Sequence, residues 1–419
     1  MKIHLISLGC DKNLTDSEKM LALSCERGYE FTDDPSVADV ILVNTCAFIL
    51  DAEQESVNTI LEMAEVKKKD ARLVVTGCLA ERFKDDIKKE IPEVTDIIGN
   101  SEVENYLFEN NVTKRVVTTG GHFAYLKIAE GCNKRCTYCI IPFLRGAYRS
   151  HPMEDLIEEA KSLAEGGVKE LILVAQETTL YGIDIYKKKA LPELLRRLSE
   201  IDGIEWIRIM YMYPEEITDE LLETMKELPK VLHYFDIPIQ HASDNILTAM
   251  GRRTRQSEIK ERIEKIRSLL PDAVLRTTMI AGFPGETEED FEELLRFIDE
   301  TDFDRLGCFA YSKEKGTAAA KIKPQIPKRI KEKRRDAVME LQQQKAFEKA
   351  SSRIGNVYRV IIEGRLPEED VYVGRTYMDA PDVDGLVYFK AGKREYMTGD
   401  MVDVRVTAAN GYDLEGEKI

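Results

Sequence analysis

The feature that most constrains the fold of this chain is a repeated alternation of short apolar runs with helical patterns. In residues 1–118 the runs KIHLISLG, DVILVNT and ARLVVTG are each followed by a segment with helical periodicity. Strands that alternate with helices in this way form a parallel sheet with helices on both faces. We therefore predict an α/β protein whose first domain, residues 1–118, contains a parallel sheet.

The same alternation continues over residues 119–352, which we assign to a second domain. Its six expected strands are AYLKIA, KELILVA, WIRIMY, YFDIPI, VLRTTMIAG and RLGCFAY. Six such units predict a partial (β/α)6 barrel of the TIM type, with its active site at the carboxyl ends of the strands. The segment KPQIPKRIKEKRR should lead into a long helix that ends at Ser352.

Residues 353–419 change in character and predict a small all-β barrel. Alternating strands are broken there by Gly and Asp turns. Such barrels often bind RNA, but this segment holds nine Lys and Arg against thirteen Asp and Glu. Together with a net charge of −16 for the whole chain, this argues against nucleic acid as the main substrate and favours a basic protein partner.

The chain carries no signal of membrane insertion or export. It has no apolar run of about 18 residues or more, and MKIHLISLGC reads as a first strand rather than a signal peptide. We therefore expect a cytoplasmic protein without a membrane partner. We also expect a monomer. Eight cysteines are too few for a disulfide scaffold, and clustered cysteines in a reducing compartment more often bind metal.

Three of the cysteines, Cys132, Cys136 and Cys139, lie in a C-x3-C-x2-C pattern directly after an expected strand. A structural zinc site needs four ligands, yet the sequence has no second CxxC pair, and His122 and His151 lie at no usual spacing. An iron–sulfur cluster explains the pattern better, because three thiolates leave one iron of a 4Fe–4S cluster open to another ligand.

Three further cysteines each follow an expected strand of the first sheet: Cys10, Cys46 and Cys78. Ligands of open α/β sheets bind beyond the carboxyl ends of the strands, so these side chains should converge. Any one of them alone would be read as a small buried apolar residue. Three cysteines at equivalent positions indicate a second cluster with an open iron. Cys25 and Cys308 fit neither set and should be packing residues.

Five other residues are candidates for binding a cofactor. Gly282 and Gly285, in AGFPGETEEDF, would allow the backbone to approach a ligand closely. Gln176, Arg149 and Gln240 also lie close to strand ends or the cysteine loop. Ordinary hydrogen bonds within loops explain these polar positions equally well. No catalytic side chain is assigned.

The pattern CxxxCxxC, with the aromatic Tyr138 before its last cysteine and six strand–helix units around it, resembles the radical S-adenosylmethionine (SAM) superfamily. This resemblance implies that SAM completes the coordination of the open iron and is cleaved to give a carbon radical. With a second cysteine set and a terminal barrel, the whole chain is similar to the methylthiotransferases. That family implies an enzyme with two 4Fe–4S clusters, two SAM molecules, a TRAM-type barrel that docks the substrate, and a reductant such as flavodoxin or ferredoxin.

Two branches of this family differ in substrate. SLGCDKNLTDSE and NTCAFI resemble the RimO branch, which methylthiolates the β-carbon of an aspartate in the small-subunit ribosomal protein S12 (uS12). YSKEKGTAAA departs from that branch by Lys315, where Glu is usual. The alternative is the MiaB-like branch, which modifies C2 of adenosine in transfer RNA. The acidic barrel favours the basic ribosomal protein.

Overall fold

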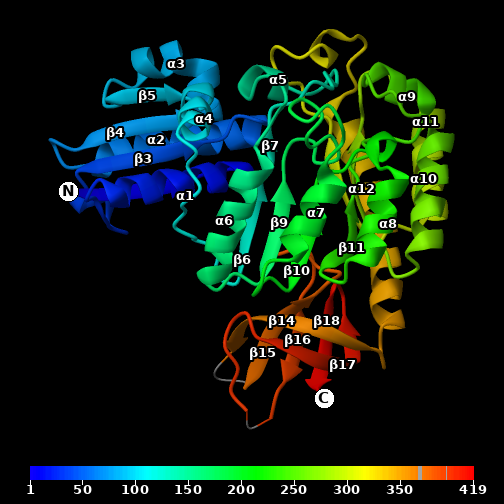
Figure 1. Ribbon diagram of the computed structural model, residues 1–419. Helices are drawn as coiled ribbons and strands as arrows, with labels where there is room; N and C mark the ends of the chain where they lie inside the picture. Colours follow the sequence, from blue (N-terminus) through cyan, green and yellow to red (C-terminus); the bar gives the residue numbers. More distant parts are fainter. Residues whose placement is uncertain (367–369, 393) are drawn as a thin grey trace.

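The chain begins with a five-stranded parallel sheet whose strands alternate with helices (Figure 1). The computed structural model describes residues 1–366, 370–392 and 394–419. The sheet has the order β2-β1-β3-β4-β5. Its strands are β1 (Lys2–Ser7), β2 (Glu30–Phe31), β3 (Val40–Thr45), β4 (Arg72–Gly77) and β5 (Asp96–Gly99). Its helices are α1 (Asp11–Glu26), η1 (Pro35–Val37), α2 (Leu50–Val66), α3 (Cys78–Glu90) and α4 (Asn100–Glu109). Because β1, β3 and β4 are neighbours, their carboxyl ends lie together at one edge.

A second sheet of six parallel strands follows, in the order β13-β12-β11-β10-β9-β6. Its strands are β6 (Phe123–Lys127), β9 (Glu170–Val174), β10 (Trp206–Ile209), β11 (Val231–Asp236), β12 (Val274–Ala281) and β13 (Arg305–Ala310). Each matches one of the six predicted strands. Since β6 and β13 are the edges of the sheet and do not pair, the barrel is partial, as predicted.

Helices cover the outer face of this sheet (Figure 1). They are α6 (Met153–Glu165), α7 (Leu191–Ser199), α8 (Asp219–Glu227), α10 (Gln256–Leu269), α11 (Glu288–Thr301) and α12 (Lys328–Ser352). Short elements line its carboxyl edge: β7 (Ala129–Glu130), α5 (Ile141–Leu144), β8 (Arg149–Ser150), η2 (Pro214–Glu216), α9 (Asp244–Ala249) and η3 (Ala319–Lys321). Alternate residues of each strand face opposite sides, so Leu171 and Leu173 of β9 pack with the helices while Ile172 and Val174 face inward.

The C-terminal segment forms a closed barrel of five strands, as predicted. The strands are β14 (Val357–Leu366), β15 (Val371–Thr376), β16 (Val387–Lys390), β17 (Met401–Asn410) and β18 (Asp413–Lys418). The barrel packs Ile361, Met378 and Ala380 against the inner face of the six-stranded sheet. At this contact Glu170 is buried between two arginines, 2.7 Å from Arg208 Nε and 2.8 Å from Arg375 Nη2. The barrel is therefore fixed to the sheet by both apolar packing and buried charge pairs.

A buried cluster of charges joins the first sheet to the second. Lys127 Nζ, at the end of β6, binds the carboxylates of Asp16 on α1, Glu104 on α4 (2.5 Å) and Glu130 (3.0 Å). Burial alone would lower the pKa of Lys127, but the three carboxylates outweigh it and raise that pKa above its usual value. The ammonium group thus takes the place that a metal ion would occupy among three carboxylates.

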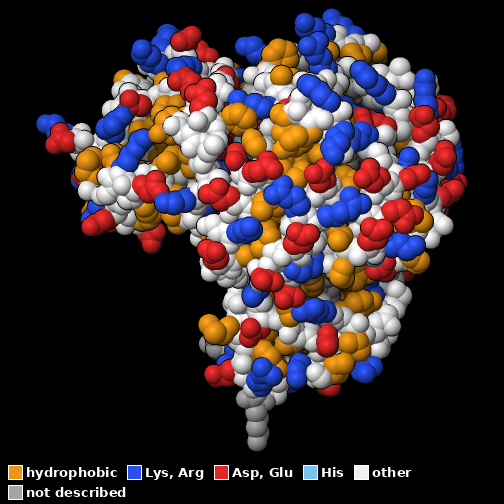
Figure 2. Space-filling model, viewed as in Figure 1, with side chains coloured by type: hydrophobic (Ala, Val, Ile, Leu, Met, Phe, Trp, Pro, Cys, Tyr) orange, Lys and Arg blue, Asp and Glu red, His pale blue; other side chains and the backbone are white. Residues whose placement is uncertain are grey.

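The surface carries charges of both signs, interspersed over the face shown in Figure 2, including the part formed by the C-terminal barrel. In the described part of the chain, every helix is too short or too polar to span a lipid bilayer.

Removing the cation of the buried cluster should destabilise the junction of the two sheets. In the variant Lys127→Met three carboxylates would lose their shared partner in a dry environment, which costs about 3–5 kcal/mol of unfolding free energy. Denaturant unfolding followed by circular dichroism measures the loss. The matched control is Lys84→Met, which breaks the exposed pair between Lys84 and Glu102 and should leave the unfolding midpoint almost unchanged. Equal effects of the two variants would contradict this role of Lys127.

Candidate metal centre

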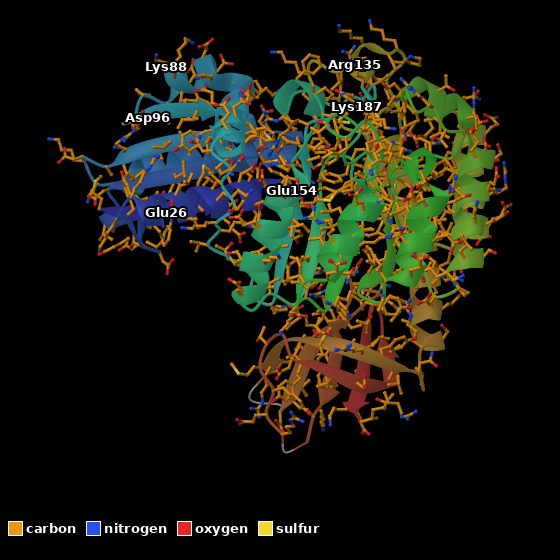
Figure 3. All side chains as sticks on the ribbon, in the orientation of Figure 1. Glu26, Lys88, Asp96, Arg135, Glu154 and Lys187 are labelled. Atoms are coloured by element: carbon orange, nitrogen blue, oxygen red, sulfur yellow. The ribbon has the colours of Figure 1, made fainter. Side chains whose placement is uncertain are left out.

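Cys132, Cys136 and Cys139 lie in the loop between β7 and α5, at the carboxyl edge of the six-stranded sheet. The loop is tightly folded: Gly131 has a φ of +75°, and a Cβ atom there would lie 2.3 Å from the carbonyl oxygen of Ala147. Arg135 also adopts a left-handed conformation, with a φ of +54°, and lies at the upper edge of the molecule in Figure 3. This backbone holds the three cysteines in one short turn.

The environment of these thiols suits a metal cluster. Burial, together with the neighbouring thiols of the set, raises the pKa of Cys132 to about 11 and that of Cys139 to about 12. These two thiols are therefore neutral near pH 7, and a bound metal would displace their protons. The backbone N–H groups of Lys134 and Ile141 donate to the sulfurs of Cys132 and Cys139, each at 3.4 Å. Such N–H donors stabilise thiolates around iron–sulfur clusters.

Cys10, Cys46 and Cys78 follow the neighbouring strands β1, β3 and β4. Cys10 caps α1, and Cys78 is the first residue of α3. The strand ends come so close that a Cβ atom on Gly9, whose φ is +91°, would lie 2.9 Å from Cys46 Sγ. The structure therefore brings the second set of cysteines together from distant parts of the sequence.

The thiols of this second set influence one another. Burial raises the pKa of Cys46 to about 11, and the thiols of Cys78 and Cys10 contribute to that increase. Burial also raises the pKa of Cys78, although the guanidinium group of Arg145 acts in the opposite direction. A second group of three converging cysteines, two of which have a raised pKa, fits a second cluster with one open iron. The sulfur of Cys308 is buried, as predicted, but Cys25 is exposed, so its prediction as a packing residue is wrong.

Residues from both sheets meet beside Cys10. Lys12 Nζ lies 3.5 Å from the centre of the Tyr211 ring and 2.9 Å from Asp11 Oδ1. Tyr211, which follows β10, donates its hydroxyl hydrogen to Asp11 Oδ1 at 3.3 Å and has a strained φ of +59°. This contact places the edge that holds Cys10 against the mouth of the six-stranded sheet. The sequence pattern did not indicate it, because Lys12 and Tyr211 are far apart along the chain.

The mouth of the second sheet contains a buried carboxyl group, that of Glu177 after β9. Burial raises its pKa to about 7, and the nearby ammonium group of Lys134 only partly offsets this effect. Lys134 Nζ lies 3.7 Å from Glu177 Oε2 and also pairs with Glu216 at 2.5 Å. The mouth is therefore polar, and Lys134 pairs there with several acidic side chains.

The side chains of the predicted cofactor-binding residues differ in the direction in which they point. Gln176 donates to Glu130 Oε1 at 2.5 Å, close to the cysteine loop, and its own Oε1 has no partner among the described residues. Gln240 has a left-handed φ of +77° just beyond β11. Arg149, in contrast, turns away from the mouth: it donates to Asn105 and lies over the ring of Phe108 on α4.

Gly282 and Gly285 form the turn after β12, both with positive φ. A Cβ atom on Gly282 would lie 2.4 Å from the side chain of Lys331, whereas Gly285 faces open space. The carboxylate of Glu286 accepts hydrogen bonds from the backbone of Gly282 and Phe283 at 2.7 and 3.1 Å. Glu286 thereby fixes the turn, and Gly285 exposes backbone that a ligand could approach.

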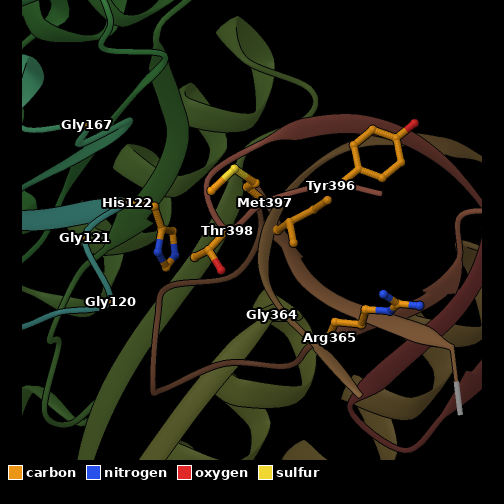
Figure 4. A pocket seen from close by; sticks show the side chains of 10 residues that line it. Gly120, Gly121, His122, Gly167, Gly364, Arg365, Tyr396, Met397 and Thr398 are labelled. Carbon is orange, nitrogen blue, oxygen red and sulfur yellow. The ribbon is translucent and has the colours of Figure 1, made fainter. Parts of the chain in front are cut away.

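A pocket of about 550 Å³ lies elsewhere, between the start of β6 and the barrel (Figure 4). His122, Arg365 and Met397 are among its lining residues. Because His122 precedes β6 and the cysteine loop follows that strand, the pocket lies at the opposite end of the sheet from the cysteines. It is therefore separate from the candidate metal centre.

Three protein families match successive parts of the chain. Residues 2–99 match the "Uncharacterized protein family UPF0004", residues 126–298 the "Radical SAM superfamily", and residues 354–419 the "TRAM domain". Among solved structures, the radical SAM methyltransferase TsrM from Kitasatospora setae, with tryptophan and a SAM analogue bound, is 14% identical. Its alignment covers 73% of this chain and 72% of that chain, with a TM-score of 0.56. At this identity the likeness shows the fold alone.

Proteins named ribosomal protein uS12 methylthiotransferase RimO are similar over the whole chain. The relative from Lachnoclostridium phytofermentans is 56% identical, with 99% of each chain covered. Those from Alkaliphilus oremlandii and Clostridioides difficile are 48% and 47% identical, covering all of this chain and 99% and 98% of theirs. The family that the cysteine motifs suggested is confirmed: the chain belongs to the RimO family of radical SAM methylthiotransferases.

Proposed function

We propose that this enzyme attaches a methylthio group to the β-carbon of an aspartate in ribosomal protein uS12. The observation that carries the proposal is the presence of two sets of three cysteines, each at the carboxyl edge of a parallel sheet. The relatives whose names state this activity match the chain from end to end. None of the relatives described above carries the name of the alternative, a MiaB-like enzyme acting on adenosine in transfer RNA.

The family implies a 4Fe–4S cluster and SAM, and we assign the cluster to Cys132, Cys136 and Cys139. We further propose a second 4Fe–4S cluster on Cys10, Cys46 and Cys78. When bound, the clusters and SAM supply the carbon radical and the sulfur that side chains cannot provide. The cysteines of both sets fit these groups, and burial raises the pKa of four of them, Cys46, Cys78, Cys132 and Cys139.

The chain's own residues position the reactants and exclude water. We propose that Gln176, Gln240, Gly282 and Gly285 contact SAM, since each lies just beyond a strand of the six-stranded sheet. Arg149 stays a prediction, because its contacts with α4 favour a structural role. The apolar cluster that joins the barrel to the sheet includes Phe123, Trp206 and Val274, the first residues of β6, β10 and β12, so the barrel keeps water from the end of the sheet opposite the cysteines.

We propose a separate role for each of three domains. Residues 1–118 hold the second cluster, residues 119–352 hold the first cluster and SAM, and residues 353–419 dock the substrate protein. The net charge of −16 favours encounter with a basic ribosomal protein over transfer RNA. A reductant such as flavodoxin or ferredoxin, a monomeric state and a cytoplasmic location also stay predictions.

Incubation of uS12 with the reconstituted enzyme, SAM and a reductant should increase the mass of one aspartate by about 46 Da, the mass of a methylthio group replacing hydrogen. Tandem mass spectrometry of uS12 peptides locates the change. A methylthio group on transfer RNA adenosine, with uS12 unmodified, would instead support the MiaB-like alternative.

The two cysteine sets should have separable roles. The wild-type protein should bind about eight iron atoms and about eight sulfides, and either triple Cys→Ala variant about half of each. The Cys132/Cys136/Cys139 variant should lose 5′-deoxyadenosine formation, because SAM binds there. The Cys10/Cys46/Cys78 variant should keep that reaction and lose sulfur insertion.

A Cys25→Ala variant is the matched control, because Cys25 is exposed and outside both sets. Its iron content and both reactions should equal those of the wild type. Sulfur insertion by the Cys10/Cys46/Cys78 variant would overturn the assignment of the second cluster.

Binding of uS12 should depend on salt. Raising the ionic strength from about 0.1 M to about 1 M shortens the Debye length from about 10 Å to about 3 Å, so affinity measured by calorimetry should fall severalfold. Asp403 and Glu415 are exposed acidic residues of the barrel. The double variant Asp403→Lys and Glu415→Lys should weaken binding further at low salt.

The control double variant is Asp70→Lys and Glu93→Lys, which makes the same change of charge on exposed residues of the first domain. It should retain most of the affinity if the barrel docks the substrate. An equal loss in both double variants would show that the barrel is not the docking surface.

A further inference from the structure

Arg145 connects the two cysteine sets. It lies six residues after Cys139, in the segment that also holds Cys132 and Cys136. Its side chain, only 1% exposed, reaches out of that loop to the edge of the first sheet. There it donates from Nη2 to Asn13 Oδ1 and from Nη1 to Asp16 Oδ2 at 3.2 Å.

Asn13 lies beside the residues that precede Cys10 and Cys46. Its amide donates to the carbonyl oxygens of Leu8 at 2.8 Å and Thr45 at 3.0 Å, which are close in sequence to Cys10 and Cys46. By binding Asn13, Arg145 places a cation where the ends of β1 and β3 are tied together.

The packing around Arg145 places it close to this set. Leu144, the residue before it, lies in one apolar cluster with Cys78 and Leu79. A Cβ atom on Gly9 would lie 3.4 Å from Asn13 Nδ2 and 2.9 Å from Cys46 Sγ, so Asn13, the partner of Arg145, is also close to Cys46. Arginine stays protonated even when buried. Glu130 Oε2 accepts from Nη1 at 2.9 Å and fixes the guanidinium group from the side of the second sheet.

We propose that Arg145 is a positioning residue that sets the reduction potential of the cluster held by Cys10, Cys46 and Cys78. The inference rests on the second cluster of the proposed function. Reduction adds an electron to the cluster, so a fixed cation close to its thiolates stabilises the reduced state. The segment that binds the first cluster thus tunes the second.

The test isolates the second cluster in the background Cys132→Ala, Cys136→Ala and Cys139→Ala. Arg145→Gln and Arg145→Lys are compared with this parent after anaerobic reconstitution, and the midpoint potential is measured by redox titration with electron paramagnetic resonance. Arg145→Gln should shift the midpoint to a more negative potential. Arg145→Lys should recover part of the shift, because it keeps the charge but loses the planar donor geometry.

The matched control is Arg115→Gln. Arg115 is also 1% exposed and also pairs with α1, through Glu18, but its other partner is Glu159 on α6. The Arg115→Gln variant perturbs the same junction without changing the charge beside the cysteines. The midpoint potential of its cluster should therefore equal that of the parent.

An unchanged midpoint in Arg145→Gln, or an equal shift in Arg115→Gln, would overturn the proposal. If Arg145→Gln alone fails to retain iron while Arg145→Lys and Arg115→Gln retain it, the dependence on this cation is supported. A parent that binds no iron would overturn the second cluster itself, and that result is distinguishable from an insensitive midpoint.

Discussion

The architecture depends on bringing three cysteine side chains close together at each of two sheet edges. Parallel strands solve this problem because their carboxyl ends share an edge. In the first sheet the neighbours β1, β3 and β4 each deliver one cysteine. In the second sheet one tight turn after β7 delivers all three. The rest of the molecule holds these two edges against each other.

Buried charge pairs provide that hold. Lys127 at the end of β6 and Arg145 after α5 bind Asp16 on α1, and Arg115 binds Glu18 on the same helix. Burying so many charges is costly unless every one is paired. These pairs are directional, so they fix the orientation of the two edges more closely than an apolar contact of similar area would.

Much of this fold could be predicted from the sequence. The strands and the long helix ending at Ser352 follow from hydrophobic periodicity, and the position of Cys10, Cys46 and Cys78 after strands was enough to expect their convergence. Arg145, Lys12 and Lys127 could not be assigned a role in this way. Their partners lie on other sheets or distant segments, and a charged residue in a loop carries no local signal of burial. Arg149 is the opposite case: its position in the sequence suggested cofactor binding, but its side chain contacts α4.

The trio of Asp16, Glu104 and Glu130 has a chemical consequence. Three carboxylates this close would chelate a hard divalent ion such as Mg²⁺ or Mn²⁺. A lysine built into β6 already fills the space between them, and it cannot be exchanged. An oxygen-preferring metal would therefore have to compete with a cation that is tethered to the chain, so the junction of the two sheets carries its own positive charge.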